Sequence, residues 1–331
     1  MSKPLLRVEN LVTEFRTEHG VVKAVDGVSF DLQEEETLAI VGESGSGKSV
    51  MAMSLMRLIP SPPGKIAAGS VSLDGVDLLG LSERDIRKVR GNKIAMIFQE
   101  PMSSLNPTLK IGFQVAEPLN LHHGMDWQAA EDRAVELLKS VRIPDAEDRA
   151  RQFPHEFSGG MRQRVMIAMG VACNPRLIIA DEPTTALDVT VQAQVLDILK
   201  DMTRSSGSAL ILITHDLGVV ARYADKVAVM YAGRIVEMAS ARDLYRDPQH
   251  PYTRGLLQSI PRLDDSSSRL VPIPGQPPNL AALPQGCAFA SRCEYKQKRC
   301  EQSRPSLTSA SSGHAVACWA VSETAEAVNY A

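Results

Sequence analysis

The chain has 331 residues, enough for one large domain with an appendage or for two modest domains. Its hydrophobic content of 44% and charged content of 23% are those of an ordinary globular protein. Its formal net charge of −3 argues against a nucleic-acid-binding protein, which usually carries an excess of basic residues. No apolar run approaches the roughly 18 residues of a membrane-spanning helix. Because residues 1–7 lack the apolar stretch of a secretory signal, we expect a cytosolic protein.

Short strands are expected in the first part of the chain. Residues 6–11 and 24–32 alternate between apolar and polar side chains, and residues 38–41 are wholly apolar. Residues 50–56 favour a helix. The segment between this last strand and the helix, residues 42–49, is rich in glycine.

Residues 42–49 form a phosphate-binding loop of the G-x-x-x-x-G-K-[ST] type, in the strand–loop–helix context that this motif requires. The glycines let successive backbone N–H groups curl toward phosphate oxygens, and the following helix adds its positive N-terminal end. We expect Lys48 to reach the β- and γ-phosphates and Ser49 to ligate Mg²⁺. The whole nucleotide-binding loop comprises Gly42, Glu43, Ser44, Gly45, Ser46, Gly47, Lys48 and Ser49.

Strands and helices then follow in an order typical of an α/β nucleotide-binding core interrupted by helices. The texture between about residues 100 and 173 is helical, with an amphipathic helix expected over residues 127–141. The other expected elements are strands at residues 71–75, 94–98, 177–180 and 210–214, a helix at 191–202 and a hairpin at 227–238 that turns at Ala232 and Gly233. Beyond residue 247 prolines become frequent, which predicts an irregular extension over residues 248–331.

Four of the five cysteines crowd into this extension, while Cys173 lies alone near the middle of the chain. In a reducing compartment such a group indicates a metal site rather than disulfides. Four thiolates suit either Zn²⁺ or a [4Fe–4S] cluster. The cysteine spacing does not distinguish between them, because short C-x2-C pairs are absent from the sequence and His314 is the only histidine nearby. The alternative is four reduced cysteines packed as small apolar side chains. The four are Cys287, Cys293, Cys300 and Cys318.

A second motif, Ser158-Gly159-Gly160-Met161-Arg162-Gln163-Arg164, resembles the signature sequence of the ATP-binding-cassette (ABC) family. The signature's usual leading leucine is Phe157 here, and its usual glutamine is Met161. The resemblance covers residues 5 to about 245. It implies an ABC-type P-loop NTPase core over residues 1–247, with an antiparallel β subdomain, a helical subdomain inserted at about residues 100–173, and the cysteine-bearing extension at residues 248–331.

This resemblance assigns an ATP hydrolysis site to further residues. Asp181 would hold Mg²⁺ at the end of the Walker B strand, and Glu182 would orient the attacking water. Gln99 resembles the glutamine of the Q-loop, which contacts Mg²⁺ and water, and His215 resembles the switch histidine that contacts the γ-phosphate. Taken singly, an acidic pair capping a strand, a solvated glutamine or a structural histidine would be the ordinary interpretation.

The same resemblance implies a head-to-tail dimer that binds two ATP molecules. Ser158, Gly159 and Gly160 begin a helix, so their N–H groups would form an anion site that closes over ATP held by a partner's phosphate-binding loop. Asp188 matches the D-loop at that interface. Phe15 is the candidate aromatic that stacks on adenine, the alternative being a core aromatic of the first hairpin.

Three segments resemble the D-type ATPase of dipeptide and oligopeptide importers, namely residues 100–107, 250–257 and 284–293. This branch implies a second, related ATPase subunit, two transmembrane permease subunits and, indirectly, an extracytoplasmic substrate-binding protein. It also implies a peripheral position on the cytoplasmic face of the membrane, and it favours a [4Fe–4S] cluster over Zn²⁺ at the four cysteines. Nickel, glutathione and opine importers share the branch, and an ABC ATPase outside transport is a further alternative.

Overall fold

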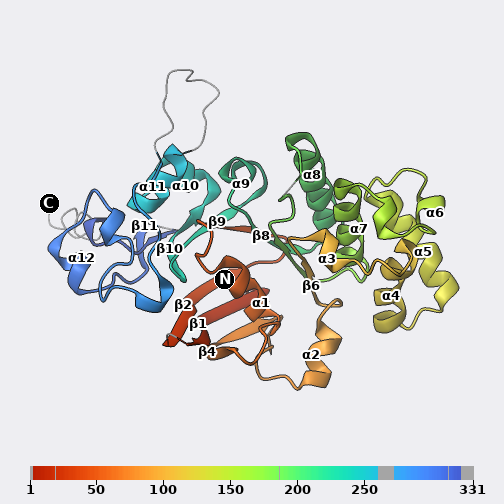
Figure 1. Ribbon diagram of the computed structural model, residues 1–331, viewed down its shortest axis with the longest axis horizontal. Helices are drawn as coiled ribbons and strands as arrows, with labels where there is room; N and C mark the ends of the chain where they lie inside the picture. Colours follow the sequence, from red (N-terminus) through yellow and green to blue (C-terminus); the bar gives the residue numbers. More distant parts are fainter. Residues whose placement is uncertain (1–2, 19, 186, 260–271, 312, 322–331) are drawn as a thin grey trace. The chain divides into compact units, whose positions relative to one another are not determined.

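The computed structural model describes residues 3–18, 20–185, 187–259, 272–311 and 313–321. The chain divides into two compact units, each built from several stretches of sequence (Figure 1). Unit 1 contains residues 1–4, 32–37 and 80–213, and unit 2 contains residues 5–31, 38–79 and 214–331. The boundary expected at residue 247 is a different division and stays a prediction. Among the described residues, no helix has both the length and the apolar character needed to span a membrane.

Unit 1 combines a parallel sheet with a group of helices. The sheet has the order β8-β7-β6, and every residue of β7 and β8 is buried, as expected for strands covered on both faces. The elements of unit 1 are α2 (Glu83–Val89), β6 (Ile94–Ile97), α3 (Pro101–Ser104), α4 (Ile111–His123), α5 (Trp127–Ser140), α6 (Ala146–Arg149), α7 (Gly159–Val171), β7 (Leu177–Asp181), α8 (Val189–Ser206) and β8 (Ala209–Ile213).

The helices of unit 1 confirm the helical texture predicted between residues 100 and 173. Helices α4 to α7 lie together, coloured yellow to green in Figure 1. Helix α7 approaches its neighbours closely through glycine: a Cβ on Gly160 would lie 2.6 Å from the Val191 side chain of α8, and one on Gly170 would lie 3.2 Å from Ile97 of β6. Small residues therefore let α7 pack tightly against its neighbouring helix and strand.

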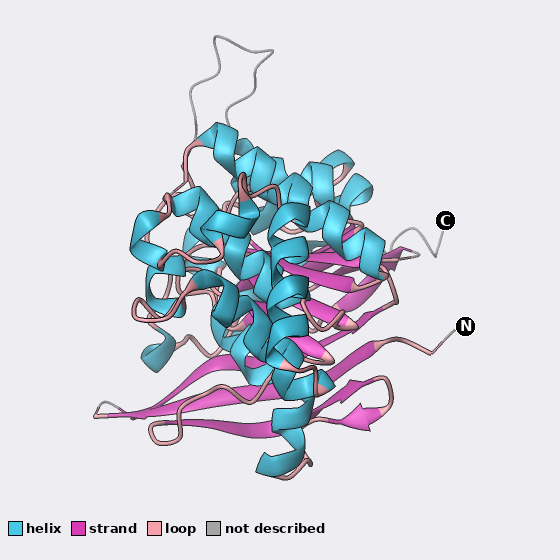
Figure 2. Cartoon of the chain, turned by 90° about the vertical axis from the view of Figure 1, so that its right-hand side faces the viewer, coloured by secondary structure: helices cyan, strands magenta, loops and turns pink. Residues whose placement is uncertain are grey.

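Unit 2 contains an antiparallel sheet of order β2-β1-β4-β5, as the alternating pattern predicts, and its long strands lie side by side in Figure 2. Strand β1 pairs with β4 from Leu6 opposite Leu73 to Phe15 opposite Gly64. The first elements of unit 2 are β1 (Leu6–Thr17), β2 (Gly20–Leu32), β3 (Thr37–Val41), α1 (Lys48–Leu55), β4 (Gly64–Leu73) and β5 (Val76–Asp77). This sheet is the antiparallel β subdomain that the sequence predicts.

A second set of strands in unit 2 has the order β11-β12-β10-β9-β3. Strands β9 and β10 form the predicted hairpin, which turns at Ala232 and Gly233, both with positive φ, between the paired residues Tyr231 and Arg234. The remaining elements are α9 (Leu217–Tyr223), β9 (Lys226–Tyr231), β10 (Arg234–Ser240), α10 (Ala241–Arg246), α11 (Pro251–Gln258), α12 (Lys298–Gln302), β11 (Thr308–Ser311) and β12 (His314–Val316), with short 3-10 turns at Pro154–Glu156 in unit 1 and at Leu280–Ala282 and Ala290–Arg292 in unit 2.

The extension beyond residue 247 is less irregular than its prolines indicate. Strand β12 pairs with β10 and so adds a hairpin to the sheet of the nucleotide-binding core. Its packing centres on three aromatic rings: the Tyr231 ring centroid lies 4.6 Å from that of Tyr252 and 5.3 Å from that of Phe289. Tyr252 is fully buried. The extension is therefore ordered by tertiary contacts with β9, and not by the local alternation of its own apolar and polar residues.

Candidate nucleotide-binding and cysteine sites

The phosphate-binding loop lies between β3 and α1 of unit 2, where the sequence predicts it. Gly42 and Gly47 have φ angles of 152° and 101°, and a Cβ on either would lie 2.2 Å from a backbone oxygen, of Met230 and Ala24 respectively. Only glycine fits at these two positions. Gly45 also has a positive φ of 78°, but a Cβ added to it would have no neighbouring atom within 4 Å. The space over Gly45 is thus left open, which fits a loop that receives phosphate oxygens.

Lys48 is the first residue of α1 and is almost completely buried. Its ammonium group donates hydrogen bonds to the carbonyl oxygens of Gly42 at 2.8 Å and Glu43 at 3.0 Å. The lysine side chain therefore folds back over the loop, and its charge is held at the loop by the loop's own carbonyls. This is the place from which an ammonium group can meet phosphate charge.

His215 follows β8 and belongs to unit 2, together with the phosphate-binding loop. It is exposed, and it lines a cavity of about 390 Å³ that is also lined by Gly42, Glu43 and Arg292. The next residue, Asp216, caps α9 by accepting hydrogen bonds from the backbone of Gly218 and Val219. Unit 2 thus brings the predicted switch histidine to the same cavity as the start of the loop.

The predicted acidic residues lie in unit 1 at the end of β7. Asp181 is buried, and Glu182 adopts a left-handed backbone with a φ of 44° while its N–H donates to the Ile213 carbonyl at 2.9 Å. The Gln99 amide donates to Glu182 Oε2 at 3.0 Å, and the Thr185 hydroxyl donates to the same oxygen at 2.8 Å. Unit 1 therefore brings Gln99 and Glu182 together, although they are 83 residues apart, and their roles in hydrolysis stay predictions.

The signature motif begins α7 in unit 1. Ser158 is the N-cap, and its hydroxyl accepts from the Met161 N–H at 3.3 Å, while Phe157 is buried. Asp188 caps α8 in the same way, accepting from the Val191 N–H at 3.0 Å. Both predicted dimer-interface motifs therefore stand at helix N-termini, where unsatisfied N–H groups and the helix dipole favour an anion.

Phe15 lies near the end of β1 and is half-buried. Its ring lies over Gly64 of β4: a Cβ placed on that glycine would come within 2.8 Å of the ring. A larger residue at position 64 would displace the ring. The stacking of Phe15 on adenine stays a prediction.

The four cysteines of the extension all lie in unit 2. Burial raises the pKa of Cys287 to about 11, and the neighbouring thiols of Cys300, Cys318 and Cys293 contribute to the increase. Burial and neighbouring cysteine thiols likewise raise the pKa values of Cys293 and Cys318. The thiols therefore lie near enough for the charge of one to disfavour charge on another. None of the four forms a disulfide, and Cys173, which is buried elsewhere, is free as well.

Four thiols are donors of the kind that Zn²⁺ or an iron–sulfur cluster takes, but the structure does not gather them into a metal site. Among the residues described, no group of three or more histidine, cysteine, aspartate or glutamate side chains is arranged closely enough to hold a metal ion. His314, the histidine nearest in sequence, has its Nε2 atom 2.7 Å from Glu237 Oε1 and is buried with that carboxylate. The histidine is thus engaged outside the cysteine group, which leaves a donor set of four thiols.

Sequence reasoning missed two residues that hold Glu43 of the phosphate-binding loop. The Arg292 guanidinium, whose side chain is 3% exposed, donates to both Glu43 carboxylate oxygens, at 2.6 and 2.9 Å. The backbone N–H of Glu43 donates to the Tyr252 hydroxyl at 2.8 Å. The hydrogen bond to Glu43 raises the pKa of Arg292 above its usual value. Residues 252 and 292 lie in segments that match importer ATPases, but nothing in the residue types or spacing links them to the loop.

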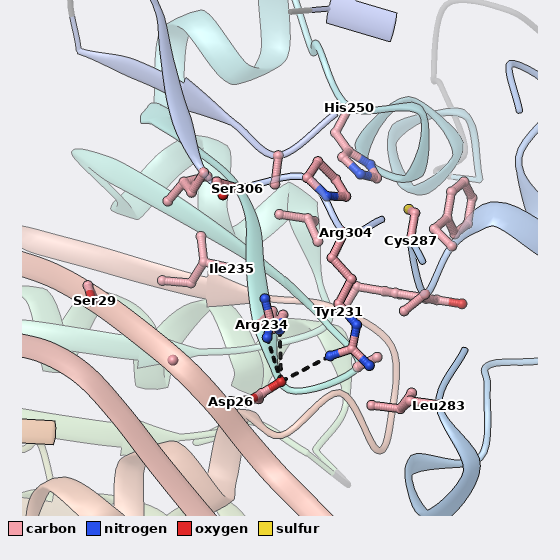
Figure 3. A pocket seen from close by; sticks show the side chains of 18 of the residues that line it. Asp26, Ser29, Tyr231, Arg234, Ile235, His250, Leu283, Cys287, Arg304 and Ser306 are labelled. Carbon is pink, nitrogen blue, oxygen red and sulfur yellow. Dashed lines mark hydrogen bonds and ion pairs between the residues drawn. The ribbon is translucent and has the colours of Figure 1, made fainter. Parts of the chain in front are cut away.

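A second cavity, of about 370 Å³, lies where the extension meets β2 and the β9–β10 hairpin (Figure 3). Asp26 accepts hydrogen bonds there from Arg234 at 2.7 and 2.9 Å and from Arg304 of the extension at 3.2 Å. Burial acts to raise the pKa of Asp26, but Arg234, Lys23 and Arg304 together lower it below its ordinary value. The carboxylate therefore stays charged and joins the extension to β2.

Comparison with known proteins places this geometry among known families. Residues 25–185 match the ABC transporter family, and residues 236–300 match the family described as oligopeptide/dipeptide transporter, C-terminal region. The chain is 54% identical to the oligopeptide transport ATP-binding protein OppD of Bacillus subtilis, over 95% of this chain and 88% of that protein. It is 50% identical to the dipeptide transport ATP-binding protein DppD of the same organism, over 97% and 96% of the two chains.

Solved structures agree with these relatives. The chain resembles the ATP-binding cassette MJ0796, solved as a dimer in a post-hydrolysis state bound to ADP and phosphate, with a TM-score of 0.65 and 28% identity. The likeness covers 72% of this chain and 99% of that one. It confirms the predicted fold class, a P-loop NTPase core of the ABC type.

Proposed function

The chain belongs to the ATP-binding proteins of ABC transporters, and from this premise we propose that it hydrolyses ATP to drive the uptake of dipeptides or oligopeptides. The observation that carries the proposal is the 54% identity to an oligopeptide transport ATP-binding protein over 95% of the chain. The match of residues 236–300 to the C-terminal region of peptide transporters supports the same cargo class. Nickel, glutathione and opine uptake remain the alternatives among cargoes.

Each residue of the site has a role in this proposal. Lys48 and the N–H groups of the loop bind the phosphates, and Ser49 and Asp181 are the residues that would hold Mg²⁺, whose charge would offset that of the phosphates. Glu182 orients the attacking water, and Gln99, which donates to Glu182 Oε2 at 3.0 Å, would contact Mg²⁺ and that water. His215 contacts the γ-phosphate, and Phe15 stacks on adenine. The geometry at Glu182 supports this assignment most directly.

A dimer completes the site in this proposal. Ser158, Gly159 and Gly160 would close over ATP bound to a related ATPase subunit, with Asp188 at the interface, as the dimeric form of the similar cassette MJ0796 supports. Two permease subunits would connect the dimer to the cargo, and a substrate-binding protein would deliver the cargo on the other side. The chain would then lie on the cytoplasmic face of the membrane.

The test replaces Glu182 with glutamine, which keeps the hydrogen-bonding capacity but removes the charge that polarises water. Glu182→Gln should bind ATP with unchanged affinity, trap the closed dimer and lower the hydrolysis rate of the assembled transporter by at least about 100-fold. The matched control is Glu131→Gln, an exposed glutamate of α5. Hydrolysis at the wild-type rate by the Glu182 variant would refute its catalytic role. Peptide-stimulated hydrolysis with the permease subunits, compared with nickel and glutathione, tests the cargo.

We also propose a [4Fe–4S] cluster bound by Cys287, Cys293, Cys300 and Cys318, with Zn²⁺ as the alternative, from the number of cysteines in the extension and its resemblance to importer ATPases. Four cysteines supply enough ligands for either group, and a bound metal would hold them as thiolates. The group would cross-link the extension. Anaerobic purification with metal analysis and visible absorption decides: iron and sulfide support the cluster, zinc alone supports the alternative, and a protein that holds neither iron nor zinc refutes the site.

A further inference from the structure

Glu43 stands in the phosphate-binding loop, yet its contacts reach into the extension. Its N–H donates to the Tyr252 hydroxyl at 2.8 Å, its carboxylate receives two hydrogen bonds from Arg292, and its carbonyl accepts from Lys48 at 3.0 Å. These bonds leave the Glu43 peptide little freedom to rotate. The residue links the lysine that meets phosphate to two side chains more than 200 residues away, at separations of 209 and 249 positions.

The two side chains that hold Glu43 are themselves held firmly. Tyr252 is fully buried, and the Arg292 guanidinium also donates to the Pro274 carbonyl at 2.9 Å and lies 5.9 Å from the centroid of the Tyr231 ring. Bidentate hydrogen bonds from arginine fix the orientation of a carboxylate as well as its position. A long side chain that is already immobilised loses little further entropy when it binds. Arg292 and Tyr252 therefore form a rigid frame for the loop.

We propose that Arg292 and Tyr252 are positioning residues for ATP binding, which set the orientation of the Glu43 peptide and through it the place of Lys48. Tyr252 turns the Glu43 N–H away from the phosphates, so that the N–H groups later in the loop form the phosphate cradle. Arg292 fixes the carboxylate of the same residue. The proposal goes beyond the hydrolysis site described above and rests on it, because it presupposes that the loop binds ATP.

Arg292 lies beside the cysteines of the extension in the sequence. It lies on the loop between Cys287 and Cys293 and is the residue immediately before Cys293. Whatever fixes these two cysteines also fixes the guanidinium that holds Glu43. The extension is thereby connected to the affinity for ATP, and its role exceeds that of a stabilising appendage.

The test is a set of variants of the full chain, measured by equilibrium binding of Mg²⁺-ATP through displacement of a fluorescent ATP analogue. We expect Arg292→Met to raise the Kd for ATP on the order of tenfold, because it leaves the Glu43 carboxylate without its buried partner. Arg292→Lys should restore part of the affinity, since it keeps the charge but loses the bidentate geometry. Tyr252→Phe, which keeps the ring and removes the acceptor, should raise the Kd about threefold.

A double-mutant cycle separates positioning from general stability. Glu43→Gln and Arg292→Met act on one interaction, so the double variant should bind ATP about as weakly as the Arg292 variant alone. The matched control is Arg304→Met, which removes an extension arginine that pairs with Asp26, outside the loop. It should lower the melting temperature less than Arg292→Met does, because Asp26 keeps its two hydrogen bonds from Arg234, and it should leave the Kd for ATP unchanged.

Two outcomes overturn the inference. The first is a wild-type Kd in both Arg292→Lys and Tyr252→Phe, the mild variants that keep the fold. The second is an Arg304→Met variant that loses affinity as much as the Arg292 variant, which would show that any loosening of the extension weakens binding. A failure of the proposed function looks different: the wild-type chain itself would then bind no ATP.

Discussion

The phosphate-binding loop and the cysteine-bearing extension are built in opposite ways. The residue types of eight consecutive positions set most of the loop's backbone, because only glycine allows the close approaches to Met230 and Ala24, while the extension holds Glu43 of the loop. The extension takes its shape from distant partners: Glu237 of β10 accepts hydrogen bonds from the N–H groups of Gln249 and His250, at 2.7 and 2.9 Å. A position that only glycine can occupy can be recognised from a sequence motif, whereas a hydrogen bond between residues far apart in the chain cannot. Each prediction below tests one side of this contrast.

The largest effect is expected at Gly47 in the loop. Gly47→Ala places a Cβ 2.2 Å from the Ala24 carbonyl oxygen in a left-handed backbone, so both the contact and the conformation oppose it. We expect a loss of about 3 kcal/mol or more in the free energy of unfolding, and no measurable ATP binding. Denaturant unfolding and equilibrium ATP binding measure the two effects.

Gly45→Ala is the matched control for Gly47→Ala. Gly45 shares the positive φ, but no atom lies within 4 Å of its added Cβ. The variant should therefore lose only the conformational part, about 1–2 kcal/mol. Equal losses in the two variants would show that backbone conformation, and not close approach, makes glycine necessary in this loop.

The next effect is expected at Gly286, beside Cys287 in the extension. A Cβ there would lie 2.1 Å from the Cys300 carbonyl oxygen, which already accepts the Cys287 N–H at 2.7 Å. Gly286→Ala should separate these two cysteine segments and cost about 2 kcal/mol. Thermal unfolding measures the change against the exposed control Ser291→Ala. A variant that keeps the wild-type stability would contradict the tight packing of this segment.

The sequence predicted the nucleotide-binding core well because its motifs are contiguous. Local residue types favour the observed conformation in the glycine-rich loop at residues 42–49, in the strand before Glu182 and in the turn at Ala232 and Gly233. The structure confirms the placement of all three. The contact between Arg292 and Glu43 spans 249 residues and has no pattern that marks it. For the same reason, the sequence did not predict the hairpin β11–β12. Its short strands are stabilised by the pairing of β12 with β10 and lack a clear alternation of apolar and polar residues.

The smallest effect, and the one specific to pH, concerns His250 at the start of α11. Burial lowers the pKa of this fully buried histidine to about 3, because the charged form would lose its hydration. Its Nδ1 atom accepts the Tyr252 N–H at 3.0 Å, so the neutral imidazole also serves as the N-cap of α11. Protonation would thus remove the cap of the helix that carries Tyr252.

The sign of the pH effect follows from the two states. The folded pKa of about 3 lies below the ordinary value of 6.5, so between these values the unfolded chain binds a proton that the folded chain does not. Stability should therefore be complete well above pH 6.5 and fall as the pH decreases, by roughly 1 kcal/mol at about pH 5.8 from this group. His250→Asn keeps a capping acceptor but cannot titrate, so its melting temperature should fall less between these pH values than that of the wild type. The exposed control His155→Asn should follow the wild type, and a His250→Asn variant that does the same would show that this part of the extension opens to water before the chain unfolds.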